Sequence, residues 1–376
     1  MKIFYYFQDL ETNMFNWQRV HIIDELGRHG VDIDTFNPLY FLTPEEANDK
    51  ALSILKQGNY DLFFTNVCYH KMLFVDTIEE IKKMGVPTLC LRCDNLIIPY
   101  NDKILAPHFD LVWLTSVETK HLYDKWGVNS FFAPYAANPY TFTFTQCDII
   151  RRPCFIGTPY GSRSIMINTL TSNKIEVDAY CLPASTITKH DKDESKIMSN
   201  IIAPNKLEFY FSELKFKEGR KLLYGGLFNK LKRNTRLIDN AYLHKKEFVK
   251  FSEISTLYSK YSLCMSSTST NHTDALRNPL KVVNLRAFEI PMSGGINICK
   301  YNQELGKYFE EEKEIVFYRE NEELVDKVRY YIERASDDEI MKIKKAARLR
   351  AEKEHTWWNR FMVAFEILEL THMINK

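Results

Sequence analysis

An arginine and a glutamate three residues apart are the pair in this sequence best suited to chemistry. Arg286 and Glu289 lie in NLRAFEIPM, and this spacing puts both side chains on one face of a helix. A guanidinium can clamp phosphate oxygens, and a carboxylate one turn later can accept hydrogen bonds from two neighbouring sugar hydroxyls. The same spacing also fits a weak ion pair on a protein surface, so the pattern alone leaves both interpretations open.

The residues around this pair predict a helix, a turn and a buried strand. We predict a helix over Asn284–Met292, a stop at Ser293–Gly295 and a strand over Ile296–Cys299. Gly294 and Gly295 stand where a helix C-cap requires positive φ. Such a helix would direct its first backbone N–H groups and its dipole at an anion such as phosphate, with Asn284 at its start.

A glycine and an arginine follow the first predicted strand of the second half, CFIG. Gly157 and Thr158 end this strand, and Arg163 stands at the start of the next helix. A glycine lets the backbone approach a ligand closely, and the arginine could reach a diphosphate. An ordinary tight turn and a solvated helix residue explain the same residues. The later loop Ser266–Asp274, SSTSTNHTD, offers hydroxyls and a histidine to a sugar, or is simply a polar loop.

In the first half, the best candidate for acid–base chemistry is Asp94. It follows the strand PTLCLR in RCDN, at the carboxyl end of that strand. A carboxylate there could take the proton from an acceptor hydroxyl that attacks an anomeric carbon. The alternative is that Asp94 and Asn95 begin a turn before Pro99.

Strands and helices alternate through both halves of the chain. We predict strands in the first half over Lys2–Phe7, Val31–Phe36, Tyr60–Val67, Val86–Arg92, Leu111–Thr115 and Phe131–Ala133. The alternation predicts a parallel sheet with helices on both faces, but no G-x-G-x-x-G follows the first strand, which argues against dinucleotide binding. The pattern restarts after a linker at Ala136–Arg152. The region Lys206–Lys232 is predicted to be mostly helical, with aromatic residues on one side.

The composition of the chain limits the classes of protein to which it can belong. A chain of 376 residues with 45% hydrophobic residues is long enough for two domains. A net charge of +1 argues against a protein that coats nucleic acid. The eight cysteines form no paired framework, and Cys90 and Cys93 would point to opposite faces of a strand, so we expect reduced thiols and no zinc. We find no signal peptide and no membrane-spanning run, and expect a cytoplasmic protein.

Four segments in the C-terminal part carry a family resemblance. In order they are NLRAFEIPMSGGINI, the acidic stretch up to Val316–Tyr318, ENEELVDKVRYYIE and AARLRAEKEHTWWNRF. Together they resemble the CgeB-like glycosyltransferases, a family related to the GT-B nucleotide-sugar glycosyltransferases of families 1 and 4. The family pattern is an Asn-Leu-Arg-x-Phe-Glu helix, a Gly-rich turn and strand, a further helix and a closing His-Thr-Trp segment.

This resemblance implies an α/β protein of GT-B fold, with two Rossmann-like domains facing a cleft. It implies an acceptor domain over residues 1–145, a nucleotide-sugar domain over 146–355, and a helix over 356–376 that packs back across the domain junction. It also implies site residues. The donor would be bound by Gly157, Thr158, Arg163, Asn284, Arg286 and Glu289, with Glu289 on the ribose. The acceptor side would include Asn13, Gln18 and Asn95, with Asp94 as the base.

One departure from the family pattern matters for the mechanism. Family 4 enzymes carry a second glutamate eight residues before the one at Glu289, and here that position is Lys281. Retention and inversion therefore both stay open. The absence of a D-x-D motif agrees with a metal-independent enzyme without a cofactor, in which helix N–H groups and arginine stabilise the leaving diphosphate. The expected partners are the donor and an unknown acceptor, not nucleic acid. The alternatives are a non-catalytic nucleotide-sugar-binding protein and a nucleotide-sugar epimerase.

Overall fold

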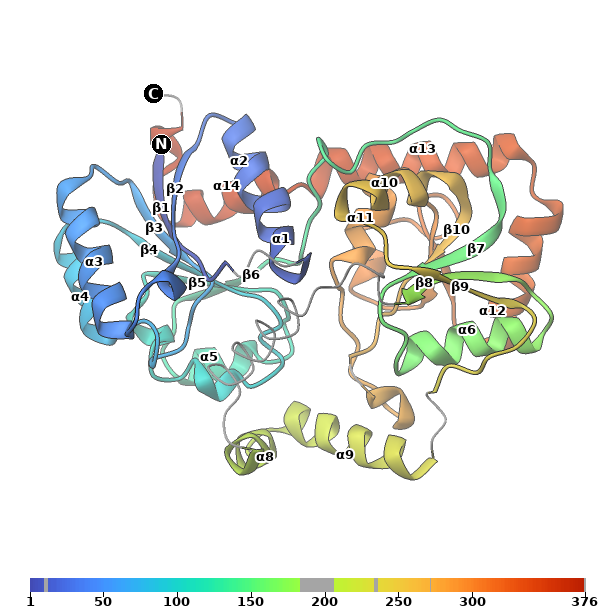
Figure 1. Ribbon diagram of the computed structural model, residues 1–376, viewed down its shortest axis with the longest axis horizontal. Coiled ribbons are helices and arrows are strands. Elements are labelled where there is room, and N and C mark those ends of the chain that lie inside the picture. The colour runs from blue at the N-terminus through green and yellow to red at the C-terminus, as the bar shows by residue number, and fades with distance from the viewer. Residues whose placement is uncertain (10–12, 183–205, 233–235, 271, 375–376) are drawn as a thin grey trace. The chain divides into compact units, whose positions relative to one another are not determined.

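The computed structural model describes residues 1–374 apart from 10–12, 183–205, 233–235 and 271 (Figure 1). The chain divides into two compact units. The first contains the described residues of Met1–Pro134, Asp193–Gly219 and Trp357–Lys376, and the second those of Tyr135–Lys192 and Arg220–Thr356. The first unit is therefore built from three separate stretches of sequence.

The first unit holds a six-stranded parallel sheet in the order β2-β1-β3-β4-β5-β6. Its strands are β1 (Lys2–Tyr6), β2 (Asp32–Phe36), β3 (Leu62–Thr65), β4 (Thr88–Arg92), β5 (Leu111–Leu114) and β6 (Ser130–Phe132). The central strands are apolar and buried along their length, which is typical of a parallel sheet covered on both faces. The predicted parallel sheet is confirmed, and its strand order reverses between β1 and β3.

The first unit also contains seven α-helices within the described residues. They are α1 (Asn13–Gln18), α2 (Asp24–Arg28), α3 (Pro44–Gln57), α4 (Val75–Lys83), α5 (Lys120–Lys125), α8 (Lys206–Leu214) and α14 (Trp357–Ile367). A π-helical turn, Arg19–Ile23, joins α1 to α2. Helix α3 begins as the sequence predicts, because the Thr43 side chain accepts a hydrogen bond from the Glu46 N–H at 3.2 Å and Pro44 takes the first helical position.

The second unit holds another six-stranded parallel sheet, in the order β12-β11-β10-β7-β8-β9. Its strands are β7 (Ile150–Ile156), β8 (Val177–Leu182), β9 (Leu243–Glu247), β10 (Tyr261–Met265), β11 (Asn297–Lys300) and β12 (Val316–Tyr318). This is the order of a doubly wound nucleotide-binding sheet, and it reverses between β7 and β10. The core includes Phe155, Leu263, Ile296 and Ile298, which have between 0% and 3% of their surface exposed.

The helices of the second unit are α6 (Ser162–Ser172), α10 (Phe251–Lys260), α11 (Arg286–Met292), α12 (Asn321–Arg329), α13 (Asp337–Glu354) and most of α9 (Lys217–Lys232). The predicted helical region Lys206–Lys232 is confirmed as α8 and α9. None of the helices in the described part of the chain is both long and apolar enough to cross a membrane.

The turn after α11 follows the sequence prediction in part. Gly294 has a φ of 69°, in the left-handed region that favours glycine, and an added Cβ would collide with the Phe144 ring. The prediction of positive φ at Gly295 was wrong, since the φ of this residue is not positive. Gly295 is constrained by packing instead, because a Cβ there would lie 2.9 Å from Ile290 and 3.0 Å from the Tyr258 carbonyl oxygen.

Candidate active site

The candidate site of the second unit lies where its strand order reverses. In an open parallel sheet, ligands bind outside the carboxyl ends of the strands at this point, because the loops from the two strands turn away from each other and leave a crevice. The reversal falls between β7 and β10, which end at Ile156 and Met265. The residues that follow these two strands are therefore the candidates for binding a ligand.

The turn after β7 is built on a glycine and holds an arginine. Gly157 has a φ of 139°, a conformation that side-chain-bearing residues rarely adopt, and its N–H donates to the Tyr180 carbonyl at 3.1 Å. Arg163 donates from Nη1 to the Thr158 carbonyl oxygen at 3.1 Å. Its guanidinium lies 4.5 Å from the centre of the Tyr160 ring. The predicted donor residues Gly157, Thr158 and Arg163 thus form one local turn.

A carboxylate from another loop already binds the start of α6. The Ser162 N–H donates to the Asp274 carboxylate at 3.0 Å, and the hydroxyl oxygens of Ser162 and Ser267 lie 2.5 Å apart. The N-terminus of a helix favours an anion, and Asp274 fills that role here. A ligand phosphate would therefore lie beside this first N–H group rather than on it. The contact joins the turn after β7 to the loop after β10.

Several buried polar atoms around the two loops have no hydrogen-bond partner among the described residues. They are Ser164 Oγ, His272 Nδ1, Asn284 Oδ1 and Asn297 Nδ2. Asn284 uses its Nδ2 to donate to the Ser267 carbonyl, and the Ser266 hydroxyl donates to Asn297 Oδ1 at 2.8 Å. An unsatisfied buried polar group costs about 1–3 kcal/mol, so this set favours a ligand with many hydroxyls and polar edges.

In the Arg286–Glu289 pair on α11, the carboxylate is buried and the guanidinium is partly exposed. Arg286 Nη1 lies 2.5 Å from Glu289 Oε2, which confirms that both side chains share one helix face. Glu289 has no exposed surface, whereas the Arg286 side chain is 31% exposed. The weak surface ion pair is therefore excluded. A ribose could reach Glu289 only if the Arg286 side chain moved aside.

The electrostatic surroundings keep Arg286 charged. Burial disfavours the charged guanidinium, but the Glu289 carboxylate and the Tyr258 hydroxyl outweigh it and raise the pKa of Arg286. Tyr258 is itself buried, and that burial raises the pKa of its hydroxyl. The arrangement holds one permanently charged guanidinium, partly exposed, beside a buried carboxylate. Such a charge suits a phosphate more than a neutral sugar.

The first unit presents Asp94 in a turn after β4. Asp94 has a φ of 51°, its N–H donates to Thr115 Oγ1 at 3.1 Å, and its carbonyl accepts from the Ile97 N–H at 2.9 Å. The turn interpretation of RCDN is therefore confirmed. Asp94 is exposed, so the turn also leaves its carboxylate accessible. Its role as a base stays a prediction.

The predicted acceptor-side residues have structural contacts in this conformation. Asn95 is fully buried; its Nδ2 donates to the Ser116 carbonyl at 2.7 Å and its Oδ1 accepts from the Ser116 N–H at 2.8 Å. Gln18 is also buried, and its Oε1 accepts from the Tyr5 hydroxyl at 2.6 Å. Asn13 begins α1, but its side chain lies outside the described residues. These contacts hold neighbouring segments together and use polar atoms of Asn95 and Gln18 that could otherwise bind a ligand.

A buried group of charged residues at the carboxyl end of β4 was not predicted from the sequence. Arg92, the last residue of β4, donates from Nε to Asp102 Oδ2 at 2.6 Å, and the Tyr123 hydroxyl donates to the same oxygen. Asp102 has no exposed surface, and its Oδ1 has no hydrogen-bond partner in the described structure. Burial raises the pKa of Asp102 even though Arg92 and Tyr123 oppose the shift. No local sequence signal links these residues.

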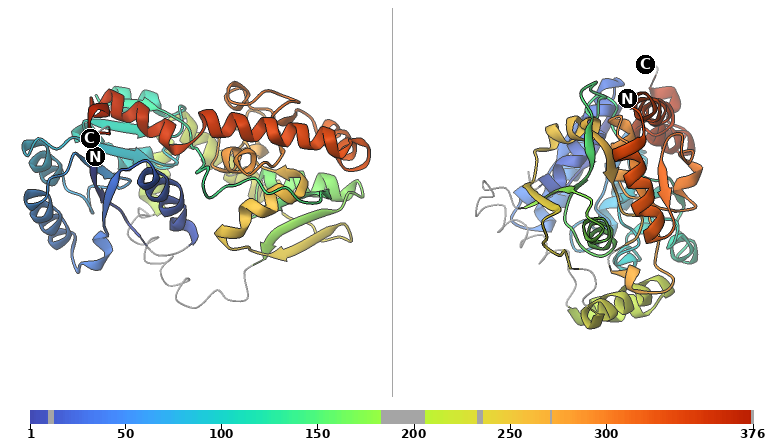
Figure 2. Two further views of the ribbon diagram at one scale, coloured as in Figure 1. Left: turned by 90° about the horizontal axis from the view of Figure 1, so that it is seen from above. Right: turned by 90° about the vertical axis from the view of Figure 1, so that its right-hand side faces the viewer.

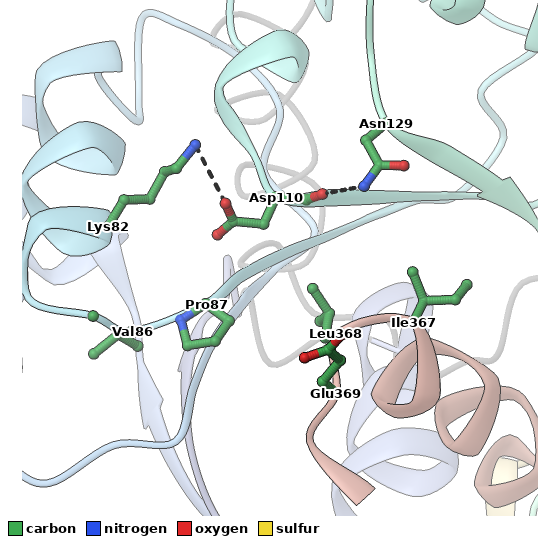
Figure 3. Close-up of a pocket in the computed structure, with 9 residues that line it drawn as sticks. Lys82, Val86, Pro87, Asp110, Asn129, Ile367, Leu368 and Glu369 are labelled. Atoms are coloured by element: carbon green, nitrogen blue, oxygen red, sulfur yellow. Dashed lines mark hydrogen bonds and ion pairs between the residues drawn. The ribbon is translucent and has the colours of Figure 1, made fainter.

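A cavity of about 440 Å³ lies in the first unit, at the opposite end of the strands from Asp94 (Figure 3). It is lined at the amino ends of the strands, by Val86 and Pro87 before β4, Asp110 before β5 and Asn129 before β6. The Lys82 ammonium lies 3.3 Å from the Asp110 carboxylate at its rim. Because parallel-sheet ligands bind at carboxyl ends, we assign this cavity no part in the candidate site. Within the described parts of the chain, no three His, Cys, Asp or Glu residues form a group suited to a metal ion.

Comparison with known proteins shows what the later part of the chain resembles. Residues 209–366 match a family model described as "Glycosyl transferase-like". Over these residues the chain is similar to that family. The matched segment contains the loop after β10 and the Arg286–Glu289 pair. The comparison with curated proteins gives no match.

Solved structures of the same fold span the whole chain. Sucrose-phosphate synthase from Thermosynechococcus elongatus is 11% identical with a TM-score of 0.56, covering 100% of this chain and 99% of that one. Anabaena HepE in complex with UDP and glucose is 13% identical with a TM-score of 0.54, covering 97% and 98%. An alpha-glucosyltransferase in complex with UDP and a 13-mer DNA is 13% identical with a TM-score of 0.59, covering 100% of both. These likenesses confirm the predicted GT-B fold, while the CgeB-like subfamily stays a prediction.

Proposed function

We propose that this protein transfers a sugar from a nucleoside-diphosphate sugar to the hydroxyl of an acceptor. One observation carries the proposal: the segment that matches the glycosyltransferase-like model holds the half-buried Arg286–Glu289 pair and the polar loop after β10. A permanently charged guanidinium and unsatisfied polar atoms at the reversal point of a doubly wound sheet suit a ligand that combines phosphates with hydroxyls.

Each donor residue has a role in this proposal. Arg286 and Arg163 bind the diphosphate, and the turn at Gly157 and Thr158 lets the backbone approach it. Asn284 binds a hydroxyl or base edge through its buried Oδ1, and Glu289 receives the ribose once Arg286 turns to the phosphates. The two arginines would stabilise the charge that develops on the leaving diphosphate, without need of a metal ion.

We take uridine as the first donor base to test. Anabaena HepE and the alpha-glucosyltransferase share this fold and are described in complex with UDP. The acceptor class stays open, and DNA belongs among the acceptors to test because the alpha-glucosyltransferase is in complex with DNA.

Asp94 is the proposed base for direct displacement, which would invert the anomeric centre. Lys281 stands where family 4 enzymes have a glutamate, and its Nζ donates to the Tyr301 carbonyl at 2.9 Å. No carboxylate is therefore supplied at that position for a retaining mechanism.

A thermal-shift panel of UDP, GDP, dTDP, ADP and CDP tests the donor site. A ligand at a hundred times its dissociation constant should stabilise the protein by about 2.7 kcal/mol. We expect one nucleotide to shift the native protein and not Glu289→Gln, while Glu253→Gln on α10 behaves as the native protein does. If no nucleotide shifts the native protein, the proposal fails. Formation of an epimeric nucleotide sugar without any acceptor would instead identify an epimerase.

A further inference from the structure

The sheet of the first unit has its own reversal point, between β1 and β3. Ligands of an open parallel sheet bind outside the carboxyl ends of its strands at such a point. The ends of β1, β3 and β4 lie side by side, because these strands are neighbours in the sheet and neighbouring strands are about 4.8 Å apart. Side chains from β1 and β4 can therefore meet one small ligand at the end of β3.

Arg19, in the π-helical turn between α1 and α2, lies at the end of β1. Its Nε donates to Asp9 Oδ2 at 2.7 Å, and its guanidinium carbon lies 5.7 Å from the centre of the Phe7 ring, the residue that follows β1. The Asp9 side chain is 2% exposed, whereas that of Arg19 is 45% exposed. A buried carboxylate thus holds one edge of the guanidinium and leaves the rest accessible to a ligand.

Arg92 repeats this arrangement at the end of β4. Its Nε is held by Asp102, which has no exposed surface, and its Nη1 donates to the Asn66 carbonyl oxygen at 3.4 Å. Asn66 follows β3, so the Arg92 side chain reaches from its own strand to the end of the next. Among the described residues Arg92 Nη2 makes no hydrogen bond, and the side chain is 19% exposed.

Two buried polar atoms in the loop after β3 have no hydrogen-bond partner in the described structure. They are Asn66 Oδ1 and His70 Nδ1. The turn that carries them is held by other atoms, since the Thr65 hydroxyl donates to the Tyr6 carbonyl at 2.8 Å and accepts from the Val67 N–H at 2.9 Å. An amide oxygen accepts a hydrogen bond from a hydroxyl, and a histidine ring nitrogen can accept or donate one. The loop therefore suits a ligand that supplies hydroxyls.

The two arginines add a requirement for negative charge. A guanidinium is a planar fork of N–H donors that matches the oxygens of a phosphate or carboxylate. Stability alone gives little reason for these pairs, because partly exposed ion pairs contribute little and a buried carboxylate costs desolvation energy. A neutral sugar would use the loop after β3 and leave both guanidiniums without an anion. A sugar that carries an acidic group satisfies both features.

We propose that the acceptor of the sugar transfer is an acidic sugar or glycan, whose phosphate or carboxylate is bound by Arg19 and Arg92. Asn66 and His70 bind its hydroxyls. Asp94 stands two residues after Arg92 at the same strand end, so the bound anion holds a neighbouring hydroxyl close to the proposed base. The identity of this ligand as the acceptor rests on the proposed function, whereas the anion site rests on the first unit alone.

Isothermal titration calorimetry of the full-length protein tests the anion site. The probes are glucose 6-phosphate, glucuronate and glucose, each titrated with and without UDP. We expect one of the charged sugars to bind at least about ten-fold more tightly than glucose, and its binding to weaken as salt is raised. The tighter of the two charged sugars identifies the anion as a phosphate or a carboxylate.

Two variants remove the arginine contacts. Arg19→Gln should weaken binding of the charged sugar about ten-fold, because it deletes a charge-assisted hydrogen bond. Arg92→Lys should weaken it similarly, because lysine keeps the positive charge beside Asp102 but lacks the planar fork. The matched control is Arg28→Gln on α2, whose arginine is 51% exposed and pairs with Asp24 at 3.0 Å near the amino end of β2. It should bind as the native protein does.

The melting temperature of each variant identifies any that has lost its fold. The proposal is overturned if the native protein binds all three sugars equally or binds none of them, or if Arg19→Gln binds the charged sugar as tightly as Arg28→Gln. If a nucleotide stabilises the native protein while no charged sugar binds, the anion site fails and the proposed function stands. If a charged sugar binds while no nucleotide does, the anion site stands and the assignment of its ligand as an acceptor falls with the proposed function.

Discussion

The Glu25 carboxylate of α2 accepts a hydrogen bond from the backbone N–H of Trp358 at 2.8 Å, and another from the Trp357 N–H at 3.3 Å. Glu25 has no exposed surface. A buried carboxylate from the start of the chain thus caps the N-terminus of its last long helix, α14, where the helix dipole favours a negative charge. The cap joins residues 333 positions apart and closes the first unit.

We predict that Glu25→Ala lowers the free energy of unfolding by about 2 kcal/mol, because two buried N–H groups lose their acceptor. Urea denaturation followed by circular dichroism measures the loss. Glu366→Ala, an exposed glutamate on the same helix, is the control and should change stability very little. Equal stability of the two variants would show that the cap contributes nothing.

We predict that Glu213 makes stability fall with rising pH. Burial raises its pKa from the ordinary value of 4.5 to about 7, and the hydrogen bond from the Ile98 N–H opposes this only in part. Between these values the unfolded chain releases the proton while the folded chain keeps it. The folded state therefore binds more protons there, and its stability declines by up to about 3 kcal/mol as pH rises through the window.

The variant Glu213→Gln isolates this contribution. It keeps an oxygen acceptor for the Ile98 N–H but cannot ionise, so it should gain stability relative to the native protein as pH rises. The measurement is the difference in unfolding free energy between the two proteins, just below and just above the window. A difference that does not change with pH would assign the titration to other groups.

We predict opposite effects of alanine at two glycines. Gly294→Ala should destabilise the protein by about 2 kcal/mol or more, because its φ of 69° is unfavourable for alanine and the Cβ would collide with Phe144. Gly226→Ala is the matched control in α9, with no atom within 4 Å of the added Cβ. It should stabilise by about 0.5–1 kcal/mol through helix propensity. Melting temperatures compare the two, and a shift of the same sign would contradict the argument.

We predict that Asp94→Asn abolishes most sugar transfer without affecting nucleotide binding. Asparagine tolerates the left-handed conformation of Asp94, so the turn should survive while the base is lost. Loss of a general base costs about 10²–10⁴ in kcat. Turnover and the thermal shift with the donor nucleotide are measured together, with Asp49→Asn on α3 as the exposed control. Unchanged turnover would assign the base to another residue.

Local patterns in the sequence predicted local structure well. The strands β1 and β3 to β5 each contain an apolar run of three or four residues, and the Arg286–Glu289 spacing is set by one helix. Both features follow from neighbouring residues. The strand β9, with the sequence LHKKE, was missed because it lies at the edge of its sheet and is mostly polar.

Local patterns in the sequence did not predict contacts between distant parts of the chain. Asp274 reaches the Ser162 N–H across 112 positions, and no periodicity encodes such a contact. Residues 206–219 belong to the first unit although their sequence lies well inside the stretch assigned to the second. Such placements depend on tertiary packing, which one sequence with its local periods does not reveal.

During synthesis of the chain, the sheet of the first unit is complete long before its last helix, α14. All six strands of that sheet lie within the first 132 residues, whereas α14, drawn in red beside that sheet in Figure 2, follows only after residue 356. Phe361 of α14 packs on Phe64 of β3 and Trp113 of β5. Throughout the translation of the second unit, one apolar face of a completed sheet is left without its covering helix. We therefore expect nascent chains of this protein to aggregate more readily than the complete chain until this helix arrives.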